Sequence, residues 1–264
     1  MKLQYTFPFG QQVHTVEQSD RTPKKVFILG VYASAVHAKW TSETGQTLIQ
    51  AFAVASEPSI FWRGENAGEI VDGITIPIEL GHLEPASPDF NGPSGRALDD
   101  LFLHPLGVER SDSWLCDLLP HACLNKGQQN AIEKKYKPLM AKHHLPEVTV
   151  PPVPKQFADE QRRQEICDEI RRADPSLVLL LGDQPIRWFL SAYGSYHGLS
   201  DFGTKSKYGQ VHPILVNEKR YNVLPLVHPR QAGGLSSHSI DWRKAHHAWT
   251  KRRSRGLGKE YLGT

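Results

Sequence analysis

The sequence predicts an α/β protein of three layers (α/β/α), in which helices cover both faces of a central, mainly parallel sheet. Two short apolar runs, residues 26–29 (VFIL) and 177–181 (LVLLL), are each followed by a glycine, which favours buried strands. Residues 155–172 and 183–193 flank the second run and have apolar residues at helical spacing. Strands that alternate with helices are typical of a parallel sheet covered on both faces.

The length of 264 residues allows one substantial core, and we expect one α/β domain over residues 25–250. Residues 1–24 are polar and mixed, and are expected to form an arm on its surface. Residues 41–89 are expected to be an insertion, in which VDGITIPIEL (71–80) forms a short strand. Residues 251–264 are rich in lysine and arginine, which indicates a solvated basic tail or a contact with phosphate groups.

Further elements follow from local patterns. Residues 92–106 have leucine and phenylalanine at helical spacing, and residues 114–119 read as a strand that Pro120 ends. Prolines between residues 125 and 154 argue against long regular structure there. Residues 211–227 predict two strands joined by a hairpin, followed by a loop and a last helix.

Composition narrows the function classes. With 31 Lys and Arg against 28 Asp and Glu, the formal charge of +3 does not by itself indicate a nucleic-acid partner. The three cysteines cannot all pair and cannot supply four thiolates to an iron–sulfur cluster, so we expect a reducing compartment, the cytoplasm. The segment MKLQYTFPFG lacks the apolar core of a secretory signal. No metal-ligand spacing such as H-E-x-x-H occurs, so no metal and no other cofactor is expected.

The end of the first predicted strand (25–32) is a candidate site. Ligands bind at the carboxyl ends of strands in open α/β sheets. Gly30 is expected to stop this strand, and the small residues after it could open a helix. Tyr32 and His37 would then lie where chemistry is expected.

Five stretches occur in the order that is typical of one known family. They are LGVYASAVHA (29–38), FNGPSGRALDDLF (90–102), WLCDLLPHA (114–122), the helix around Cys167 with DPSLVLLLG (174–182), and LPLVHPRQAGG (224–234). Together they resemble the uracil-DNA glycosylase superfamily, nearest its thermostable bacterial and archaeal branch. The resemblance covers most of residues 25–249 and implies a cytoplasmic, monomeric enzyme that acts on double-stranded DNA. Such an enzyme swings a base out of the duplex and hydrolyses its N-glycosidic bond.

The resemblance also implies roles for individual residues. Phe90 corresponds to the aromatic residue that stacks on the base, in which case it lies on a loop rather than in a core. Asp117 occupies the place of the asparagine that reads the pyrimidine edge. His228 corresponds to the histidine that stabilises negative charge on the departing base. Alternatively, Asp117 caps the turn that follows it, and His228 only begins a turn before Pro229.

Several residues depart from the pattern of the resemblance. Ala33 stands where the family usually has proline, and Val31 and Tyr32 stand where activating carboxylates or amides occur. The cluster-binding cysteines of the nearest branch are missing apart from Cys167, so the protein is expected to lack a cluster. The group that activates water therefore stays open, and the candidates are Asp117, His37 and Asp89.

An aspartate at position 117 favours a cytosine-type base. An ionised carboxylate accepts a hydrogen bond from N4 of cytosine, and a protonated one could also donate to N3. Burial would raise its pKa toward the protonated form. Because removal of normal cytosine would destroy the host genome, we expect a modified cytosine, such as glucosylated hydroxymethylcytosine in phage DNA. Phe61, Trp62 and Arg63 would wall the larger cavity that this base requires.

The remaining candidates would hold the substrate. Gly30, Tyr32, Asp89 and Arg230 are expected around the base, and Arg230 through Leu235 would fill the space that it leaves. Small residues allow a close approach of the backbone, and hydroxyl, imidazole and guanidinium groups donate to phosphates. The expected DNA contacts are Ser34, Arg96, Gly233, Gly234, Ser236 and His238.

Two other functions remain open from the sequence. One is a repair glycosylase for uracil or other deaminated bases. The other is a catalytically inactive DNA-binding protein, which the missing carboxylate in the first stretch favours. A metal hydrolase is a weaker hypothesis, based only on the 13 histidines.

Overall fold

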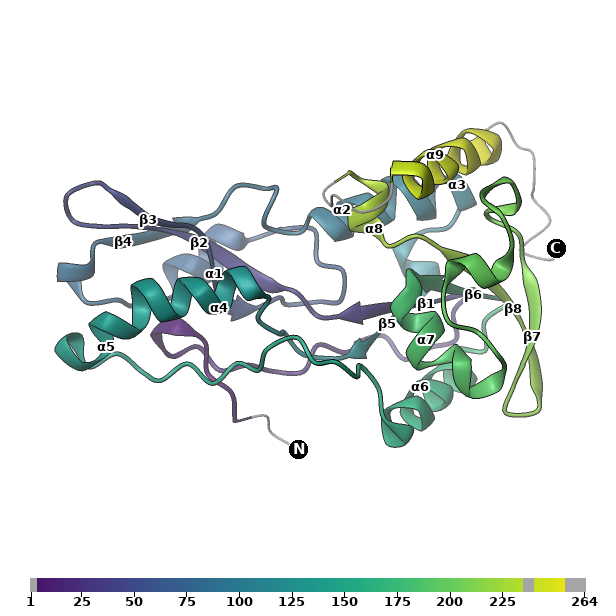
Figure 1. The fold of residues 1–264 in the computed structure, drawn as a ribbon, viewed down its shortest axis with the longest axis horizontal. Coiled ribbons are helices and arrows are strands. Elements are labelled where there is room, and N and C mark those ends of the chain that lie inside the picture. The colour runs from purple at the N-terminus through teal and green to yellow at the C-terminus, as the bar shows by residue number, and fades with distance from the viewer. Residues whose placement is uncertain (1–3, 235–239, 255–264) are drawn as a thin grey trace. The chain divides into compact units, whose positions relative to one another are not determined.

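The computed structural model describes residues 4–234 and 240–254, which divide into two compact units (Figure 1). Unit 1 takes its described residues from Met1–Val16, Tyr32–Pro93 and Pro120–Lys155. Unit 2 takes them from Glu17–Val31, Ser94–Leu119 and Gln156–Thr264. The chain therefore passes from one unit to the other several times.

Unit 2 contains a mostly parallel, five-stranded sheet, and the predicted α/β class is confirmed. The strand order is β5-β1-β6-β8-β7. β1 pairs in parallel with β6, and β6 with β8, whereas β7 and β8 form an antiparallel hairpin. The strands are β1 (Val26–Tyr32), β5 (Ser113–Leu119), β6 (Leu177–Leu181), β7 (His212–Val216) and β8 (Lys219–Leu226).

Helices lie on both sides of this sheet. α6 lies on one side, and α3 and α9 lie on the other (Figure 1). α6 begins after Asp159, whose carboxylate accepts a hydrogen bond from the Arg162 N–H (2.8 Å). The helices are α2 (Pro93–Leu98), a π-helical turn (Asp99–Leu103), α3 (His104–Leu106), α6 (Glu160–Ala173), α7 (Asp183–Trp188), α8 (Pro229–Ala232) and α9 (Ile240–Ser254).

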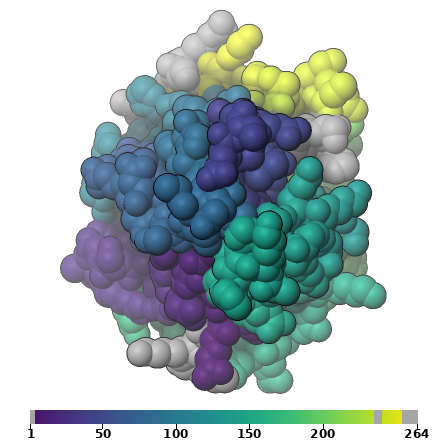
Figure 2. Space-filling model, turned by 90° about the vertical axis from the view of Figure 1, so that its left-hand side faces the viewer, coloured from purple at the N-terminus to yellow at the C-terminus, as the bar shows by residue number. Residues whose placement is uncertain are grey.

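Unit 1 is built on an antiparallel sheet of order β3-β2-β4. Its aromatic core joins the three chain segments, since Phe9 contacts Trp40, Phe52 and Tyr136 at ring distances of 5.2–6.2 Å. Figure 2 shows these segments side by side in purple, blue and teal. The elements are β2 (Ala35–Thr41), β3 (Thr47–Ser56), β4 (His82–Pro85), α1 (Ala67–Asp72), α4 (Lys126–Ala131), a π-helical turn (Ile132–Tyr136) and α5 (Lys137–His143).

The first predicted site region differs from its expectation. β1 continues past Gly30 to Tyr32, and the following residues form β2 instead of a helix. Val36, Ala38 and Trp40 are all buried. Apolar residues at every second position fit a strand, because successive side chains point to opposite faces.

The flanking segments also differ from expectation. Phe7 and Phe9 are buried in unit 1, so residues 4–16 contribute to its core rather than forming a surface arm. Residues 41–89 share this core with residues 120–155. The basic residues 251–253 continue α9, and residues 255–264 lie outside the described residues.

Two local predictions are wrong and two are confirmed. Residues 71–80 form the end of α1 and a 3-10 turn, not a strand, and α4 to α5 form a helical run where prolines argued against one. Pro138 fits there because it occupies the first turn of α5. The strand β5 and the β7–β8 hairpin are as predicted. None of the described helices combines the length and hydrophobicity that a bilayer span requires.

Candidate functional site

His228 lies at the carboxyl end of β8, beside the end of β6. The Gly182 N–H donates to the Leu226 carbonyl (2.7 Å), which joins the two strand ends. Gly182 has φ +92°, and a Cβ there would lie 3.3 Å from the His228 Cβ. Glycine at this position therefore allows His228 to pack closely. Gly182 is the N-cap of α7, and the Asp183 carboxylate accepts a hydrogen bond from the Leu199 N–H (2.8 Å).

The protonation state of His228 follows from its surroundings. His228 is the N-cap of α8, and its Nδ1 accepts a hydrogen bond from the Arg230 N–H (3.2 Å). Burial, together with the charge of Arg230, lowers the pKa of His228 to about 4. The ring is therefore neutral at pH 7, and because Nδ1 is an acceptor, the proton is on Nε2.

Asp117 lies on β5 and is 4% exposed. Its neighbour Cys116 contacts Arg162 of α6 (3.2 Å from the guanidinium to Sγ), so the Asp117 side chain points to the opposite face of the sheet. Burial raises the pKa of Asp117 to about 7; the positive charge of Arg162 opposes the shift, and Glu169 adds to it. At neutral pH the protonated and ionised forms are therefore comparably populated.

The sheet order places Asp117 and His228 on the same scaffold. β1 and β6 lie between β5 and β8, so three spacings of about 4.8 Å, or roughly 14 Å, separate the two outer strands. Gly30 is buried on β1, between β5 and β6.

Phe90 belongs to unit 1 and lies on a loop, as predicted. Its N–H donates to the Ser87 carbonyl (2.9 Å), and the residue remains 40% exposed. The loop ends at Gly92 (φ +74°), where a Cβ would come within 2.0 Å of the Arg63 backbone. The aromatic ring of Phe90 is thus presented by a turn that requires glycine.

Asn91 fixes this loop to β2 at His37. The Asn91 side-chain oxygen accepts from the His37 N–H (2.8 Å), and its amide donates to the carbonyls of His37 (2.9 Å) and Ala86 (3.1 Å). Asn91 is 2% exposed. Asn91 was not among the residues expected from the sequence, although it follows Phe90 directly. His37 itself lies within β2, opposite Ala53 of β3.

Replacing Asn91 by alanine is expected to lower the free energy of unfolding by roughly 2–4 kcal/mol, because buried backbone groups lose their partners. Urea unfolding followed by circular dichroism measures this. Asn222→Ala is the control, since Asn222 is exposed and donates one bond of 3.3 Å to Ser176. Equal effects of the two substitutions would contradict the role of Asn91.

Glu57 is a second residue at the site that was not expected from the sequence. It follows β3 directly and is 3% exposed. Its carboxylate accepts a hydrogen bond from the N–H of Ser34 (2.8 Å), two residues beyond the end of β1. A carboxylate therefore lies beside the first of the five stretches, although that stretch carries none. The signal available in the sequence was the position of Glu57, an acidic residue that directly follows the long apolar run of β3.

The remaining candidates lie as follows. Arg230 belongs to α8, and Gly233 is its C-cap. Gly234 (φ +74°) faces Arg243 of α9, and a Cβ added at Gly234 would lie 2.5 Å from the Arg243 guanidinium. Arg96 is half-buried in α2. Ser236 and His238 lie outside the described residues. In unit 1, Tyr32 is half-buried at the end of β1, and Ser34 and Asp89 are exposed.

The expected cavity wall needs correction. Trp62 is part of the core of unit 1, and its indole N–H donates to the Glu65 carbonyl (2.9 Å). Phe61 is buried as well, and Arg63 pairs with the Glu65 carboxylate. The two aromatic side chains therefore fill space inside unit 1, because their large apolar surfaces are more stable away from water.

The candidates thus fall into two groups. Unit 2 contains Gly30, Arg96, Asp117, His228, Arg230, Gly233 and Gly234. Unit 1 contains Tyr32, Ser34, His37, Asp89 and Phe90. Within the described part of the chain, no group of three or more His, Cys, Asp or Glu side chains could hold a metal ion.

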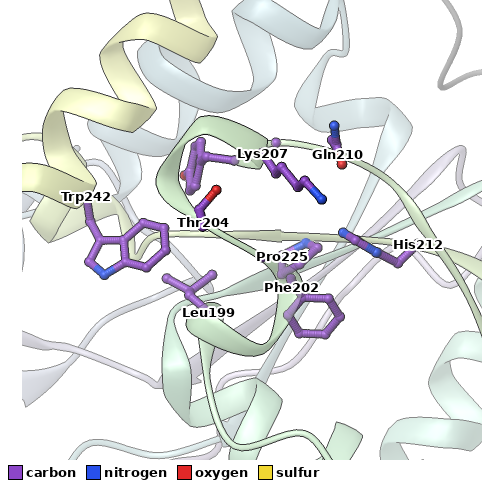
Figure 3. Close-up of a pocket in the computed structure, with 11 residues that line it drawn as sticks. Leu199, Phe202, Thr204, Lys207, Gln210, His212, Pro225 and Trp242 are labelled. Atoms are coloured by element: carbon purple, nitrogen blue, oxygen red, sulfur yellow. The ribbon is translucent and has the colours of Figure 1, made fainter.

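A pocket of about 230 Å³ in unit 2 contains none of the predicted site residues (Figure 3). Its labelled lining residues are Leu199, Phe202, Thr204, Lys207, Gln210, His212, Pro225 and Trp242.

No protein-family model matches the chain, and no curated protein matches it either.

Proposed function

We propose that this protein is a DNA glycosylase that removes a flipped pyrimidine and leaves an abasic site, with a modified cytosine as the favoured target. One observation carries the proposal. A neutral imidazole (His228) and a buried carboxyl with a pKa near 7 (Asp117) share one sheet. Double-stranded DNA, a cytoplasmic location and a monomeric state belong to the same proposal.

His228 supports the cleavage step. When the N-glycosidic bond breaks, its electron pair leaves with the base, and O2 of a pyrimidine gains negative charge. The Nε2–H of His228 donates a hydrogen bond to that oxygen. A neutral donor whose position is fixed stabilises the charge without having to reorganise during the reaction.

Asp117 supports recognition of the base. In its protonated form it donates to N3 of cytosine and accepts from the N4 amine. The same form also matches uracil, since it donates to O4 and accepts from N3–H. The ionised form keeps one accepting bond, from N4 of cytosine or from N3–H of uracil, and has no hydrogen for N3 of cytosine or O4 of uracil. Asp117 therefore matches a pyrimidine edge with two bonds only when it is protonated.

Phosphate contacts made by unit 2 would supply binding energy. The exposed face of α9 carries Arg243, Lys244 and Lys251, and α9 is joined to α8, since the His247 ring lies 3.2 Å from the Ala232 carbonyl. Cations on such a face favour the DNA backbone.

The hydrolytic water needs a base. Its oxygen forms the new bond to C1′, and its proton passes to a nearby acceptor. In unit 2 the candidate acceptor is Asp117. The other candidates belong to unit 1 and are His37, Asp89 and the Glu57 carboxylate, which lies beside the loop after β1.

Excision of both pyrimidines is expected to fall as the pH rises through about 7. Asp117 then ionises and loses the hydrogen that it donates to N3 of cytosine or to O4 of uracil. Single-turnover excision of either base should decrease over this range. A rate that does not change between about pH 6 and pH 8 would contradict this role of Asp117.

The proposal is tested by incubating the protein with duplexes that contain cytosine, uracil, hypoxanthine, hydroxymethylcytosine or its glucosylated form. Released bases are identified by mass spectrometry, and abasic sites by alkaline cleavage. Release of a modified cytosine supports the proposal, whereas release of uracil alone contradicts the preferred target. No release from any duplex contradicts glycosylase activity.

Two further functions have specific support. A repair glycosylase for uracil is favoured by the protonated form of Asp117, which fits the uracil edge. A catalytically inactive DNA-binding protein is favoured by Val31 and Tyr32, which stand where an activating acid is expected. If the protein binds duplexes tightly but forms no abasic sites in them, the inactive DNA-binding protein is favoured.

A further inference from the structure

A chain of buried hydrogen bonds lies directly behind His228. The Val227 N–H donates to the Tyr208 hydroxyl (2.9 Å), which lies 2.7 Å from Nδ1 of His246. Nε2 of His246 lies 3.0 Å from the Leu101 carbonyl. The chain therefore connects the residue before His228 to α9 and to the π-helical turn.

The direction of each bond is determined by its partners. The Tyr208 oxygen accepts from Val227, so its own hydrogen is available to Nδ1 of His246. Burial lowers the pKa of His246 to about 4, so the ring is neutral, and its Nε2–H donates to the Leu101 carbonyl. Burial also raises the pKa of Tyr208, which keeps the phenol protonated.

The His246 end of this chain of hydrogen bonds is held firmly. His246 is 0% exposed and packs against Phe102 and Trp249, with ring centroids 4.3 and 5.1 Å away. The turn after Tyr208 is fixed as well, because Gly209 has φ +81° and a Cβ there would come within 2.1 Å of the Trp249 ring. Tyr208 thus has little freedom to move.

We propose that Tyr208 is a positioning residue for His228: its hydroxyl, held by His246, anchors the Val227 N–H and so fixes the backbone directly before His228. This inference rests on the proposed function, in which Nε2 of His228 must meet a base oxygen. A displacement of the order of an ångström is sufficient to reduce catalysis strongly. The phenol acts through the backbone and does not touch the base.

The test uses Tyr208→Phe, with Tyr136→Phe as a matched control. The Tyr136 hydroxyl is also buried, accepts from the Phe9 N–H (3.0 Å) and donates to the Pro146 carbonyl (3.0 Å), but it lies in unit 1. Tyr208→Phe is expected to lower the single-turnover excision rate about tenfold, with DNA affinity changed by less than about twofold. Tyr136→Phe is expected to leave the excision rate unchanged.

A double-mutant cycle separates positioning from general damage to the fold. In a His228→Ala background, Tyr208→Phe should cause no further loss of rate, because the group that it positions is absent. An equal loss in both backgrounds would overturn the inference, as would a wild-type rate in the single variant.

Failure of the proposed function has a different signature, since the wild-type protein would then release no base. The inference is then decided by ¹⁵N NMR of the histidine side chains. Tyr208→Phe should shift the His228 ring signals, and Tyr136→Phe should not. Unchanged His228 signals in Tyr208→Phe would overturn the inference.

Discussion

Replacing His228 by alanine is expected to lower the single-turnover rate of base excision by about 10²–10³-fold, the usual effect of removing one fixed donor from a developing oxyanion. DNA affinity should change little, because the hydrogen bond strengthens only as charge develops on the base. Rates at saturating protein, together with binding measured by fluorescence anisotropy, separate the two quantities.

The matched control for this variant is His212→Ala. His212 lies on β7 of the same unit, and burial lowers its pKa as well, but it packs against Phe202 and lies opposite Val223, within β8 rather than after its end. Its removal should leave the rate within about twofold of the wild-type value. A comparable loss in both variants would show that the His228 effect is not specific.

Replacing Asp117 by asparagine is expected to stabilise the protein at alkaline pH by up to roughly 4 kcal/mol. The pKa of Asp117 is raised from 3.8 to about 7 in the folded chain. Between these values the folded form holds a proton that the unfolded chain releases, so stability falls as the pH rises through this window. Asparagine carries no charge and removes that dependence.

Urea unfolding at about pH 4 and pH 8 measures this effect, and the gain should be confined to the higher pH. Asp112→Asn is the control with the opposite sign, since a hydrogen bond from Lys25 lowers the pKa of Asp112. An equal gain from Asp117→Asn at both pH values would contradict the raised pKa. In excision assays the same variant should favour uracil, because an amide donates to O4 and accepts from N3–H.

Much of the α/β sheet was predictable from local sequence. The runs that form β1 and β6 are almost wholly apolar, and β5 is apolar apart from Ser113 and Asp117. Their neighbours have apolar residues at helical spacing. The turn between β7 and β8 was also predictable; Asn217 and Glu218 there adopt φ +46° and +65°, which suits a two-residue hairpin. The exposed position of Phe90 followed from the proline and glycine around it.

The candidate site was less predictable, because its properties arise between residues far apart in the chain. Residues 35–41 were mistaken for the start of a helix, although their apolar side chains alternate. The Ser34–Glu57 bond and the attachment of Asn91 to β2 depend on how β2 pairs with β3 and where the Phe90 loop returns.

The sequence by itself therefore determined the α/β class, most of its strands and the residue types available for chemistry, since these follow from spacing along the chain. Only the tertiary structure decided the division into two units and the protonation of Asp117, His228 and His246. Burial of a charged group in a medium of low polarity shifts its pKa, and burial depends on which distant segments pack together.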